Sequence, residues 1–302
     1  MRHRRPSIAI ALSLCSCAAS REVQGPAVPP TLHVTPWQPA GISSSQFESH
    51  PVLDPATSTL YFVRSNPSFS GWRIMSSRCR GGRWSEPSPV GFAGDGVEAD
   101  PFITRDGLSL YFISTRSENG VRQRELDIWR VDRRRRSDPW GSPQRLPEPI
   151  NSPGAEWFPR PAVDGWLYFG SNRPGGRGGT DIYRARREQG AWRVENLGEA
   201  VNGPGDEYEA EISPDGRQML LMADGDLFLL TRNGEGWTGR RKLDAQVNTS
   251  ALEVGPTFAP DGRSFLFARD MGAAGPSGGA SGELMLASMA AGGMRAWRPP
   301  CA

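Results

Sequence analysis

The sequence predicts an all-β fold, a β-propeller of four-stranded antiparallel blades, and two observations support this prediction. The 302-residue chain contains 36 Gly and 27 Pro, about a fifth of all residues, whereas these two residue types together average about 12 %. Because each costs about 1–3 kcal/mol in a helix interior, this composition excludes a helical bundle. A unit of roughly fifty residues also recurs five times, which is the size of a four-stranded propeller blade.

Residues 1–17 have the features of an export signal. Several arginines precede an apolar run that is too short to span a bilayer but suits the core of a secretory signal. Residues 14–17, Leu-Cys-Ser-Cys, resemble the lipobox of bacterial lipoproteins, which implies acyl chains on Cys17. An ordinary secretory signal cut one or two residues later is the alternative. We expect residues 18–33 to form a flexible tether and residues 34–302 to form the propeller domain.

Two cysteines, Cys79 and Cys301, remain in the body of the chain after the signal. An exported protein can form disulfides, and these cysteines lie on the first and the last copy of the repeat. In a ring that closes end to end these copies are neighbours, so a disulfide between them is one expectation. Two unpaired thiols are the other, since the sequence does not give the distance.

Each copy of the repeat contains a turn signal followed by an apolar strand. The dipeptide Asp-Gly, or Ala-Thr in the first copy, occupies positions that lie 50, 58, 51 and 46 residues apart: 56–57, 106–107, 164–165, 215–216 and 261–262. Glycine accepts the positive φ that a tight hairpin requires. The strand after the turn is typified by Leu60-Tyr61-Phe62 and Leu110-Tyr111-Phe112.

A second strand and a tryptophan follow in each copy. The strand has an acidic start in four copies, at Asp127, Asp181, Asp226 and Glu283, and the tryptophans are Trp84, Trp140, Trp192, Trp237 and Trp297. Short runs of aromatic and aliphatic residues between Gly, Pro, Asp and Asn are typical of strands. Because one four-stranded sheet cannot bury both faces, we expect the copies to pack around an axis with a tryptophan between blades.

The two ends of the chain complement each other. Trp37-Gln38-Pro39 and Ile42 form a strand-like segment without a blade of its own, whereas the last copy ends soon after Trp297. We therefore predict that residues 34–46 supply the missing strand of the final blade.

Several motifs within the repeats indicate a known family. Ser-Pro-Asp-Gly at 213–216, Gly-Ser-Asn-Arg at 170–173 and Gly-Gly-Thr-Asp-Ile-Tyr at 178–183 resemble the WD40-like β-propeller repeats of the TolB type. The stretches that begin at Asn151, Asn202 and Asn248 resemble its exported lipoprotein branch. The resemblance covers residues 34–298 and implies protein partners at the channel mouth or the top loops. Five copies are visible, and six blades stay open because the best-known relatives have six.

A glutamate stands eight residues before each turn position: Glu48, Glu98, Glu156, Glu207 and Glu253. Equal register means equal height in a propeller, so we expect a carboxylate ring near one mouth of the axial channel, with Asp100, Trp157, Glu209 and Glu211 nearby. Unpaired carboxylates a few ångströms apart repel by about 1–4 kcal/mol per pair, so such a ring would attract a cation, an ammonium group or a partner's basic side chains. Alternatively, each glutamate accepts backbone N–H bonds from the next blade and is structural.

The arginines follow two patterns. The run Arg133–Arg136 could grip acidic groups such as lipid phosphates, or it could form a solvated hairpin tip. Three others follow the apolar strands, and we expect them to pair with the acidic strand starts Asp127, Asp181 and Glu283; they are Arg116, Arg173 and Arg269.

No sequence motif indicates an enzyme. The chain has no P-loop, no metal-spaced Cys/His cluster and no Rossmann fingerprint followed by a helix, and its only histidines are His3, His33 and His50. That leaves little material for a histidine-based metal site or a catalytic triad. With 35 basic and 33 acidic residues, nothing points to nucleic acid as a partner.

The favoured interpretation is a monomeric, non-catalytic scaffold without cofactor or metal. It is expected to be lipid-anchored in the cell envelope, at the outer membrane facing the periplasm. There it would bind an envelope protein or a peptidoglycan-associated protein through its channel mouth and top loops. One alternative is a carbohydrate-binding or glycan-hydrolysing propeller that uses acidic channel residues such as Asp100 and Glu209. A purely structural module of a larger assembly is the third interpretation.

Overall fold

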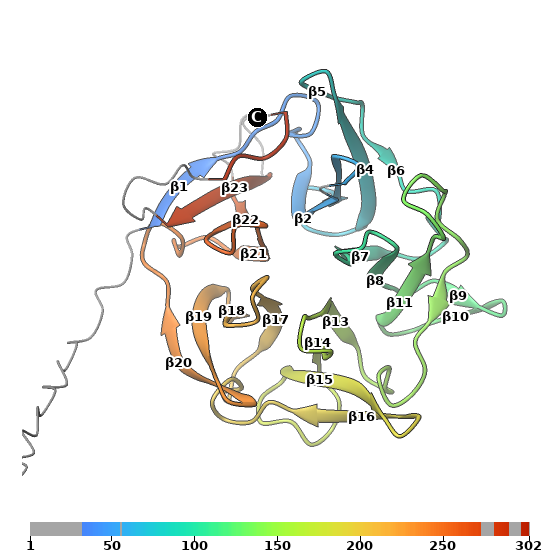
Figure 1. Cartoon of the computed structure of the whole chain (residues 1–302), viewed down its shortest axis with the longest axis vertical. Coiled ribbons are helices and arrows are strands. Elements are labelled where there is room, and N and C mark those ends of the chain that lie inside the picture. The colour runs from blue at the N-terminus through green and yellow to red at the C-terminus, as the bar shows by residue number, and fades with distance from the viewer. Residues whose placement is uncertain (1–31, 55, 273–280, 290–296, 302) are drawn as a thin grey trace, which may run out of the picture. The chain divides into compact units, whose positions relative to one another are not determined.

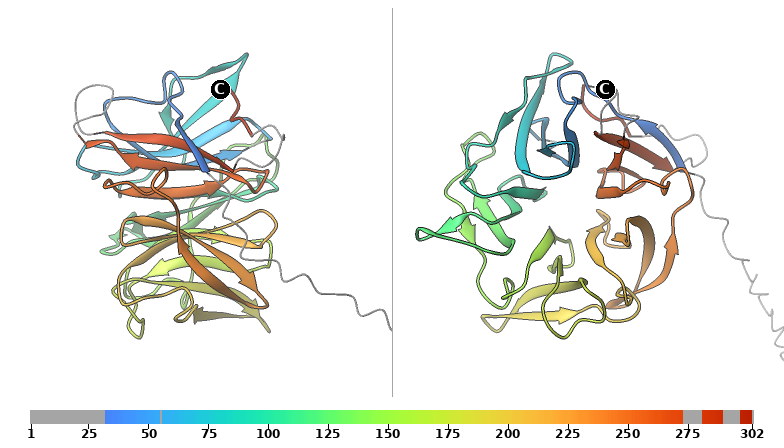
Figure 2. Two further views of the ribbon diagram at one scale, coloured as in Figure 1. Left: turned by 90° about the vertical axis from the view of Figure 1, so that its left-hand side faces the viewer. Right: turned by 180° about the vertical axis from the view of Figure 1, so that it is seen from behind.

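The computed structural model describes residues 32–54, 56–272, 281–289 and 297–301. Within these ranges the chain consists of strands, turns and irregular segments, without a helix, and so contains no helix that could cross a membrane. The strands form successive antiparallel sheets around a common axis (Figures 1 and 2). This arrangement confirms the predicted all-β propeller.

In the part of the chain that the structure describes, five groups of strands correspond to the five sequence copies, and we call them blades 1–5. Blade 1 contains β2 (Phe47–Asp54), β3 (Thr59–Ser65) and β4 (Arg73–Arg80), with the short strands β5 (Arg83–Trp84) and β6 (Ser88–Pro89) paired to β4. Blade 2 contains β7 (Glu98–Ile103), β8 (Ser109–Ser114), β11 (Asp127–Asp132) and β12 (Gln144–Arg145), beside the small hairpin β9 (Ser117–Glu118) and β10 (Val121–Arg122).

The other blades follow the same plan. Blade 3 contains β13 (Glu156–Pro161), β14 (Leu167–Ser171), β15 (Asp181–Glu188) and β16 (Ala191–Asn196). Blade 4 contains β17 (Glu207–Ile212), β18 (Gln218–Ala223), β19 (Asp226–Asn233) and β20 (Gly236–Lys242). Blade 5 contains β21 (Glu253–Phe258), β22 (Ser264–Asp270) and β23 (Gly282–Met289), and its fourth strand is β1 (Leu32–Pro36).

The N-terminal strand closes the ring, as predicted. Strand β1 runs antiparallel to β23, with Leu32 opposite Met289 and Pro36 opposite Met285. The strand covers residues 32–36 rather than 34–46, because Pro36 and Pro39 lack the N–H that a longer ladder would need. After β1 the chain turns at Ile42, whose N–H donates to the Pro39 carbonyl at 2.9 Å.

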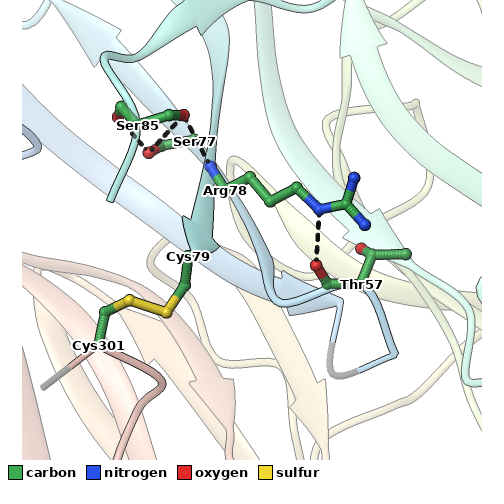
Figure 3. Close-up of a disulfide and its surroundings, with 6 residues drawn as sticks. All are labelled: Thr57, Ser77, Arg78, Cys79, Ser85 and Cys301. Carbon is green, nitrogen blue, oxygen red and sulfur yellow. Dashed lines mark hydrogen bonds between the residues drawn. A yellow bond between two sulfur atoms is a disulfide. The ribbon is translucent and has the colours of Figure 1, made fainter. Parts of the chain in front are cut away.

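A disulfide makes a second link between the ends of the chain. Cys79 in β4 is bonded to Cys301, with 5.9 Å between their Cα atoms and a sequence separation of 222 positions. Figure 3 shows the bond joining blade 1 to the C-terminal segment. The ring is therefore tied both by backbone pairing within blade 5 and by a covalent bond to blade 1.

The core lies between neighbouring blades. The central strands supply completely buried side chains in each copy, and these are Phe62, Phe112, Phe169, Leu221 and Phe267. Tryptophans add the contacts that the sequence predicts: the Trp140 indole N–H donates to the Tyr61 hydroxyl of blade 1 at 3.1 Å, and Trp237 meets Tyr168 of blade 3 edge-on at 6.3 Å. These contacts pack successive blades against each other.

Three equivalent asparagines brace the start of the third strand in blades 2, 3 and 4. The Oδ1 atoms of Asn151, Asn202 and Asn248 accept the N–H of Ile128, Ile182 and Leu227 at 2.7, 2.8 and 2.7 Å. Their Nδ2 groups donate to the carbonyls of the same three residues. Each side chain thus pairs with the strand as a further backbone unit would.

We expect Asn202→Ala to lower the free energy of unfolding by about 1–3 kcal/mol, because it leaves the buried N–H of Ile182 without a partner, whereas the Ile182 carbonyl still accepts the Leu197 N–H at 3.1 Å. Urea denaturation monitored by tryptophan fluorescence measures the change. Gln246→Ala, at an exposed position of a loop, serves as the control and should change little. A loss below about 0.5 kcal/mol for Asn202→Ala would contradict the bracing role.

Candidate functional site

The five repeated glutamates do not form an open carboxylate ring. Each is completely or almost completely buried. Each accepts the backbone N–H of the residue four positions before it, from Ser44, Gly94, Ser152, Gly203 and Thr249 to Glu48, Glu98, Glu156, Glu207 and Glu253 in turn. Each also accepts a hydrogen bond from the guanidinium of an arginine in its own blade. In the same order, these arginines are Arg64, Arg116, Arg173, Arg240 and Arg269.

The expectation that these carboxylates lack internal counter-charges is therefore wrong, because the chain itself supplies an arginine to each. The expected pairing of Arg116, Arg173 and Arg269 with acidic strand starts is wrong as well. The first two strands of each blade are antiparallel, so the arginine at the end of the second strand returns beside the glutamate that begins the first. Asp127 instead forms an ion pair with Arg145, whose Nε atom is 2.7 Å from Asp127 Oδ2.

The residues two positions after the glutamates form a different ring, which we call the axial layer. It consists of one residue from each innermost strand: His50, Asp100, Phe158, Glu209 and Gly255. All but Glu209 have positive φ values, between 50° and 66°, and each innermost strand shows a register shift at this level. Bulges re-aim side chains, and here they coincide with the residues that meet at the axis.

His50 lies at the centre of the axial layer. Its Nε2 atom is 3.1 Å from Asp100 Oδ1 and 3.0 Å from Glu209 Oε1, and its Nδ1 atom is 2.9 Å from Ser49 Oγ. The second carboxylate oxygens accept backbone N–H groups, from Phe158 to Asp100 at 2.8 Å and from Gly255 to Glu209 at 2.7 Å. All five blades therefore meet in one hydrogen-bonded network.

Burial and neighbouring charges shift the pKa values of His50 and Asp100 in opposite directions. Burial lowers the pKa of His50, but the charges of Asp100 and Glu209 raise it by more, so the net shift is upward. Burial also raises the pKa of Asp100, against the opposing effect of His50. The arrangement fits an imidazolium shared between two carboxylates, which leaves one negative charge in excess when both carboxylates are ionised.

A second polar layer lies one step deeper along the innermost strands. Arg160 Nε donates to Glu211 Oε2 at 2.7 Å, and the guanidinium carbon is 3.4 Å from the centroid of the Phe158 ring. The Phe258 N–H donates to Glu211 Oε1 at 3.2 Å. Burial raises the pKa of Glu211 to about 7, although Arg160 opposes the shift. The Nη2 atom of Arg160 and the Oγ1 atom of Thr257 are buried without hydrogen-bond partners.

These shifts predict that the protein loses stability as the pH rises from about 5 to about 8. A carboxyl with a pKa of about 7 in the folded protein keeps a proton that the unfolded chain has already lost above pH 4.5, so its contribution disappears between these values. The raised pKa of His50 acts in the same direction, since that contribution is present below about pH 6.5 and is lost as the pH rises through the folded value.

The Glu211 contribution to this pH dependence is about 3 kcal/mol. Urea denaturation at pH 5 and pH 8 measures it, and Glu211→Gln should make the dependence shallower by a similar amount. Glu199→Gln removes an exposed carboxylate and should behave as the wild type does. Equal pH slopes in wild type and Glu211→Gln would contradict the assignment.

A cavity of about 250 Å³ lies against the axial layer. His50, Asp100 and Glu209 supply its polar lining, Phe69, Trp72, Trp157 and Tyr208 supply aromatic walls, and the aliphatic part consists of Val63, Ala99, Ile113, Met222, Leu252 and Val254. The four aromatic residues and Leu252 are half-buried, whereas the three polar residues are only 4–5 % exposed. The cavity therefore has a partly open aromatic entrance and a buried polar floor.

The structure places three of the predicted mouth residues in this cavity, namely Asp100, Trp157 and Glu209. The five repeated glutamates are held in their arginine pairs and do not line it. The sequence reasoning missed His50, although it has the same offset from its repeated glutamate as Asp100 and Glu209. Aligning the position two residues after each glutamate would have found it.

At the opposite end of the innermost strands, the hairpins approach one another. Arg105, which follows β7, donates to the carbonyl of Pro214, which follows β17, so a side chain joins the non-adjacent blades 2 and 4. From the arginine run, Arg133 is turned inward: it pairs with Asp54 at 2.8 Å and lies 4.3 Å from the centre of the Trp140 ring. Residues 134–136 are exposed.

The described residues give no support for a metal-binding site. In the ranges that the structure covers, no set of three or more His, Cys, Asp or Glu side chains is arranged to hold a metal ion. The Nε2 atom of His50, which would be the natural nitrogen ligand, lies within hydrogen-bond distance of both carboxylates. Cys17, predicted to be lipidated, lies outside the described residues.

The fold and the site together define a β-propeller protein with an axial pocket. No protein-family model matches the sequence, and no curated protein is similar to it at a significant level.

Solved structures match the chain at low identity. A family 117 glycoside hydrolase from Zobellia galactanivorans has a TM-score of 0.54 at 14 % identity, over 86 % of this chain and 90 % of that chain. A TolB-type protein from Agrobacterium tumefaciens has a TM-score of 0.48 at 18 % identity, over 75 % and 71 %. An endo-arabinase from Bacteroides thetaiotaomicron has a TM-score of 0.49 at 16 % identity, over 86 % and 99 %. The first of these shows the propeller fold alone.

Proposed function

We propose that this chain is a non-catalytic binding propeller of the bacterial envelope, of the TolB type, that receives a side chain of a partner protein in its axial pocket. The observation that carries this proposal is the state of the two pocket carboxylates. Each has one oxygen on His50 Nε2 and the other on a backbone N–H. Carboxylates that are fixed in this way suit a binding site, which benefits from groups that are held in place.

The size of the cavity supports the same function. At about 250 Å³ it is smaller than the roughly 300–1,000 Å³ of pockets that enclose whole small molecules. It suits a single side chain that enters from a larger surface. Half-buried aromatic residues at the entrance, such as Trp157 and Tyr208, are the residue types that contribute most to protein interfaces.

Envelope location and lipid anchoring are part of the proposal. The disulfide between Cys79 and Cys301 suits an oxidising compartment, and the lipobox-like residues 14–17 suit an outer-membrane lipoprotein acylated on Cys17. Mass spectrometry of the mature N-terminus tests the anchor. A diacylated or triacylated Cys17 supports it, and a free N-terminus at residue 18 or beyond contradicts it.

The partner can be sought by photo-crosslinking in intact cells. A photoreactive amino acid at Leu252, at the pocket entrance, should give a discrete adduct with one envelope protein. The matched control is Val163, an exposed residue on the hairpin at the opposite end of the innermost strands, which should give none. Adducts from Val163 alone, or from neither position, contradict binding at the pocket.

Glycan hydrolysis is the second candidate, and one observation favours it. Because Asp100 and Glu209 both lie within 3.1 Å of the same nitrogen, their nearer oxygens are at most roughly 6 Å apart, a range that includes the separation of about 5–5.5 Å in retaining glycosidases. A structural neighbour is also a family 117 glycoside hydrolase. Hydrolysis of a cell-wall glycan that disappears in folded Glu209→Gln and Asp100→Asn variants would establish it in place of the binding function.

A further inference from the structure

The axial pocket combines two features that point to one ligand chemistry. Its polar lining is acidic overall, because Asp100 and Glu209 share the single positive charge of His50. The deeper pair of Arg160 and Glu211 adds no net charge when ionised. A ligand that reaches the floor therefore meets one uncompensated negative charge in a poorly solvated site, where electrostatic attraction is strong.

The apolar and aromatic walls of the pocket determine which kind of positively charged group can reach the floor. Aliphatic side chains from Val63, Met222 and Val254 and the aromatic residues of the entrance surround the path to the floor. Aromatic faces attract ammonium groups, and apolar walls stabilise an alkyl stem. Lysine has this composition, with an apolar stem and a charged end.

The floor also retains hydrogen-bonding capacity for such a group. Ionised Asp100 and Glu209 have several acceptor positions each, yet the structure gives them only the shared Nε2–H of His50 and one backbone N–H apiece. Phe158 and Gly255, which complete the axial layer, contribute no charged side chain. An ammonium group has three donors and can occupy the free positions on both carboxylates at once.

We propose that the axial pocket binds a primary alkylammonium group, which the partner protein supplies as a lysine side chain. This inference rests on the proposed function for the source of the lysine, but its chemistry can be tested without the partner. Binding adds a positive charge beside Asp100, whose burial otherwise raises its pKa. The affinity for the ammonium group should therefore increase with pH between about 5 and 8.

The test uses the purified protein and two matched pairs of probes. Trp72 and Trp157 line the cavity, so tryptophan fluorescence reports occupation. At pH 7.5, n-pentylamine should bind at least tenfold more tightly than 1-pentanol, which has the same stem without the charge. Nα-acetyl-lysine amide should compete with n-pentylamine, and its Nε-acetylated form should not. Equal binding of the amine and the alcohol, or no saturable binding of the amine, overturns the proposal.

Two substitutions in the pocket test separately how its negative charge and its aromatic wall contribute to amine binding. Glu209→Gln keeps an acceptor for the Gly255 N–H and should weaken n-pentylamine binding at least tenfold, whereas Glu199→Gln, which removes an exposed charge, should not change it. If Glu209→Gln does not fold, Trp157→Leu should weaken binding about threefold or more, because it removes aromatic surface that contacts the alkyl stem at the entrance. Full-strength binding in Trp157→Leu and in a folded Glu209→Gln overturns the proposal.

The proposed binding function and the lysine inference can fail separately. If n-pentylamine does not bind while Leu252 still crosslinks to one envelope protein, the lysine inference is wrong and the binding function stands. If n-pentylamine binds with the expected dependence on Glu209 but no partner is crosslinked, the ammonium chemistry of the pocket is supported and the proposed protein partner is wrong.

Discussion

Arg160→Met is expected to lower the free energy of unfolding by about 3–5 kcal/mol, since it leaves Glu211 buried without its counter-charge. The two residues are 1 % and 3 % exposed and are joined at 2.7 Å, and solvent cannot compensate for the missing guanidinium. The loss should be larger at pH 8 than at pH 5, because Glu211, whose pKa is already raised to about 7, can become neutral at the lower pH. Urea denaturation at the two pH values measures both effects.

The double variant Arg160→Met/Glu211→Gln is the matched control for this prediction. It removes both charges and keeps an acceptor for the Phe258 N–H, which now binds Glu211 Oε1 at 3.2 Å. At pH 8 it should be more stable than Arg160→Met alone, because the uncompensated charge is gone. A double variant that is less stable than the single one, or a single variant that loses under 1 kcal/mol at pH 8, would show that the pair contributes little.

Removal of the disulfide has the second largest expected effect. Cys79→Ala should lower the free energy of unfolding by about 2–5 kcal/mol, because the bond closes a long loop and restricts the unfolded chain. For a domain of this size, 1 kcal/mol corresponds to about 2–4 °C, so the melting temperature should fall by about 5–15 °C. Differential scanning calorimetry in non-reducing buffer measures the change.

Reductant supplies an internal control for the disulfide prediction. Cys301→Ala should match Cys79→Ala, and dithiothreitol should lower the wild-type melting temperature to that of the variants without affecting them. The reduced protein should still fold, since pairing of β1 with β23 closes the ring independently. An unchanged melting temperature of the wild type in reductant would mean that the bond adds no stability.

The fold could be predicted because its signals are local and repeated. Asp-Gly turns at four positions and apolar triplets such as Leu60-Tyr61-Phe62 define hairpins within each copy, and the copies appear as blades. The unpaired segment near Trp37 indicated closure of the last blade, although the prolines ended strand β1 earlier than predicted. The tryptophan after the third strand of blade 2 also packs between blades as predicted, since Trp140 contacts Tyr61 of blade 1.

The site could be predicted only in part. Glu209 and Asp100 were found because they stand near a repeated glutamate, but the repeated glutamates themselves were given too much weight. Their arginine partners are recognisable afterwards, and even then blade 4 departs from the pattern: β18 ends at Ala223 and is followed by Asp224 and Gly225 rather than an arginine, and Arg240 of β20 supplies the guanidinium instead. Such a replacement cannot be read from a spacing rule.

The period, the hairpins and the complementary ends of the chain were determined by the sequence itself, because turn residues and strand residues act on neighbours a few positions away. Only the tertiary structure decided which charges are neutralised and which remain available. His50 meets Glu209 across 159 positions, and that contact exists solely because blades far apart in the chain direct their innermost strands to one axis. No local pattern encodes burial at this axis. Burial strengthens the attraction between the remaining negative charge and a positively charged ligand.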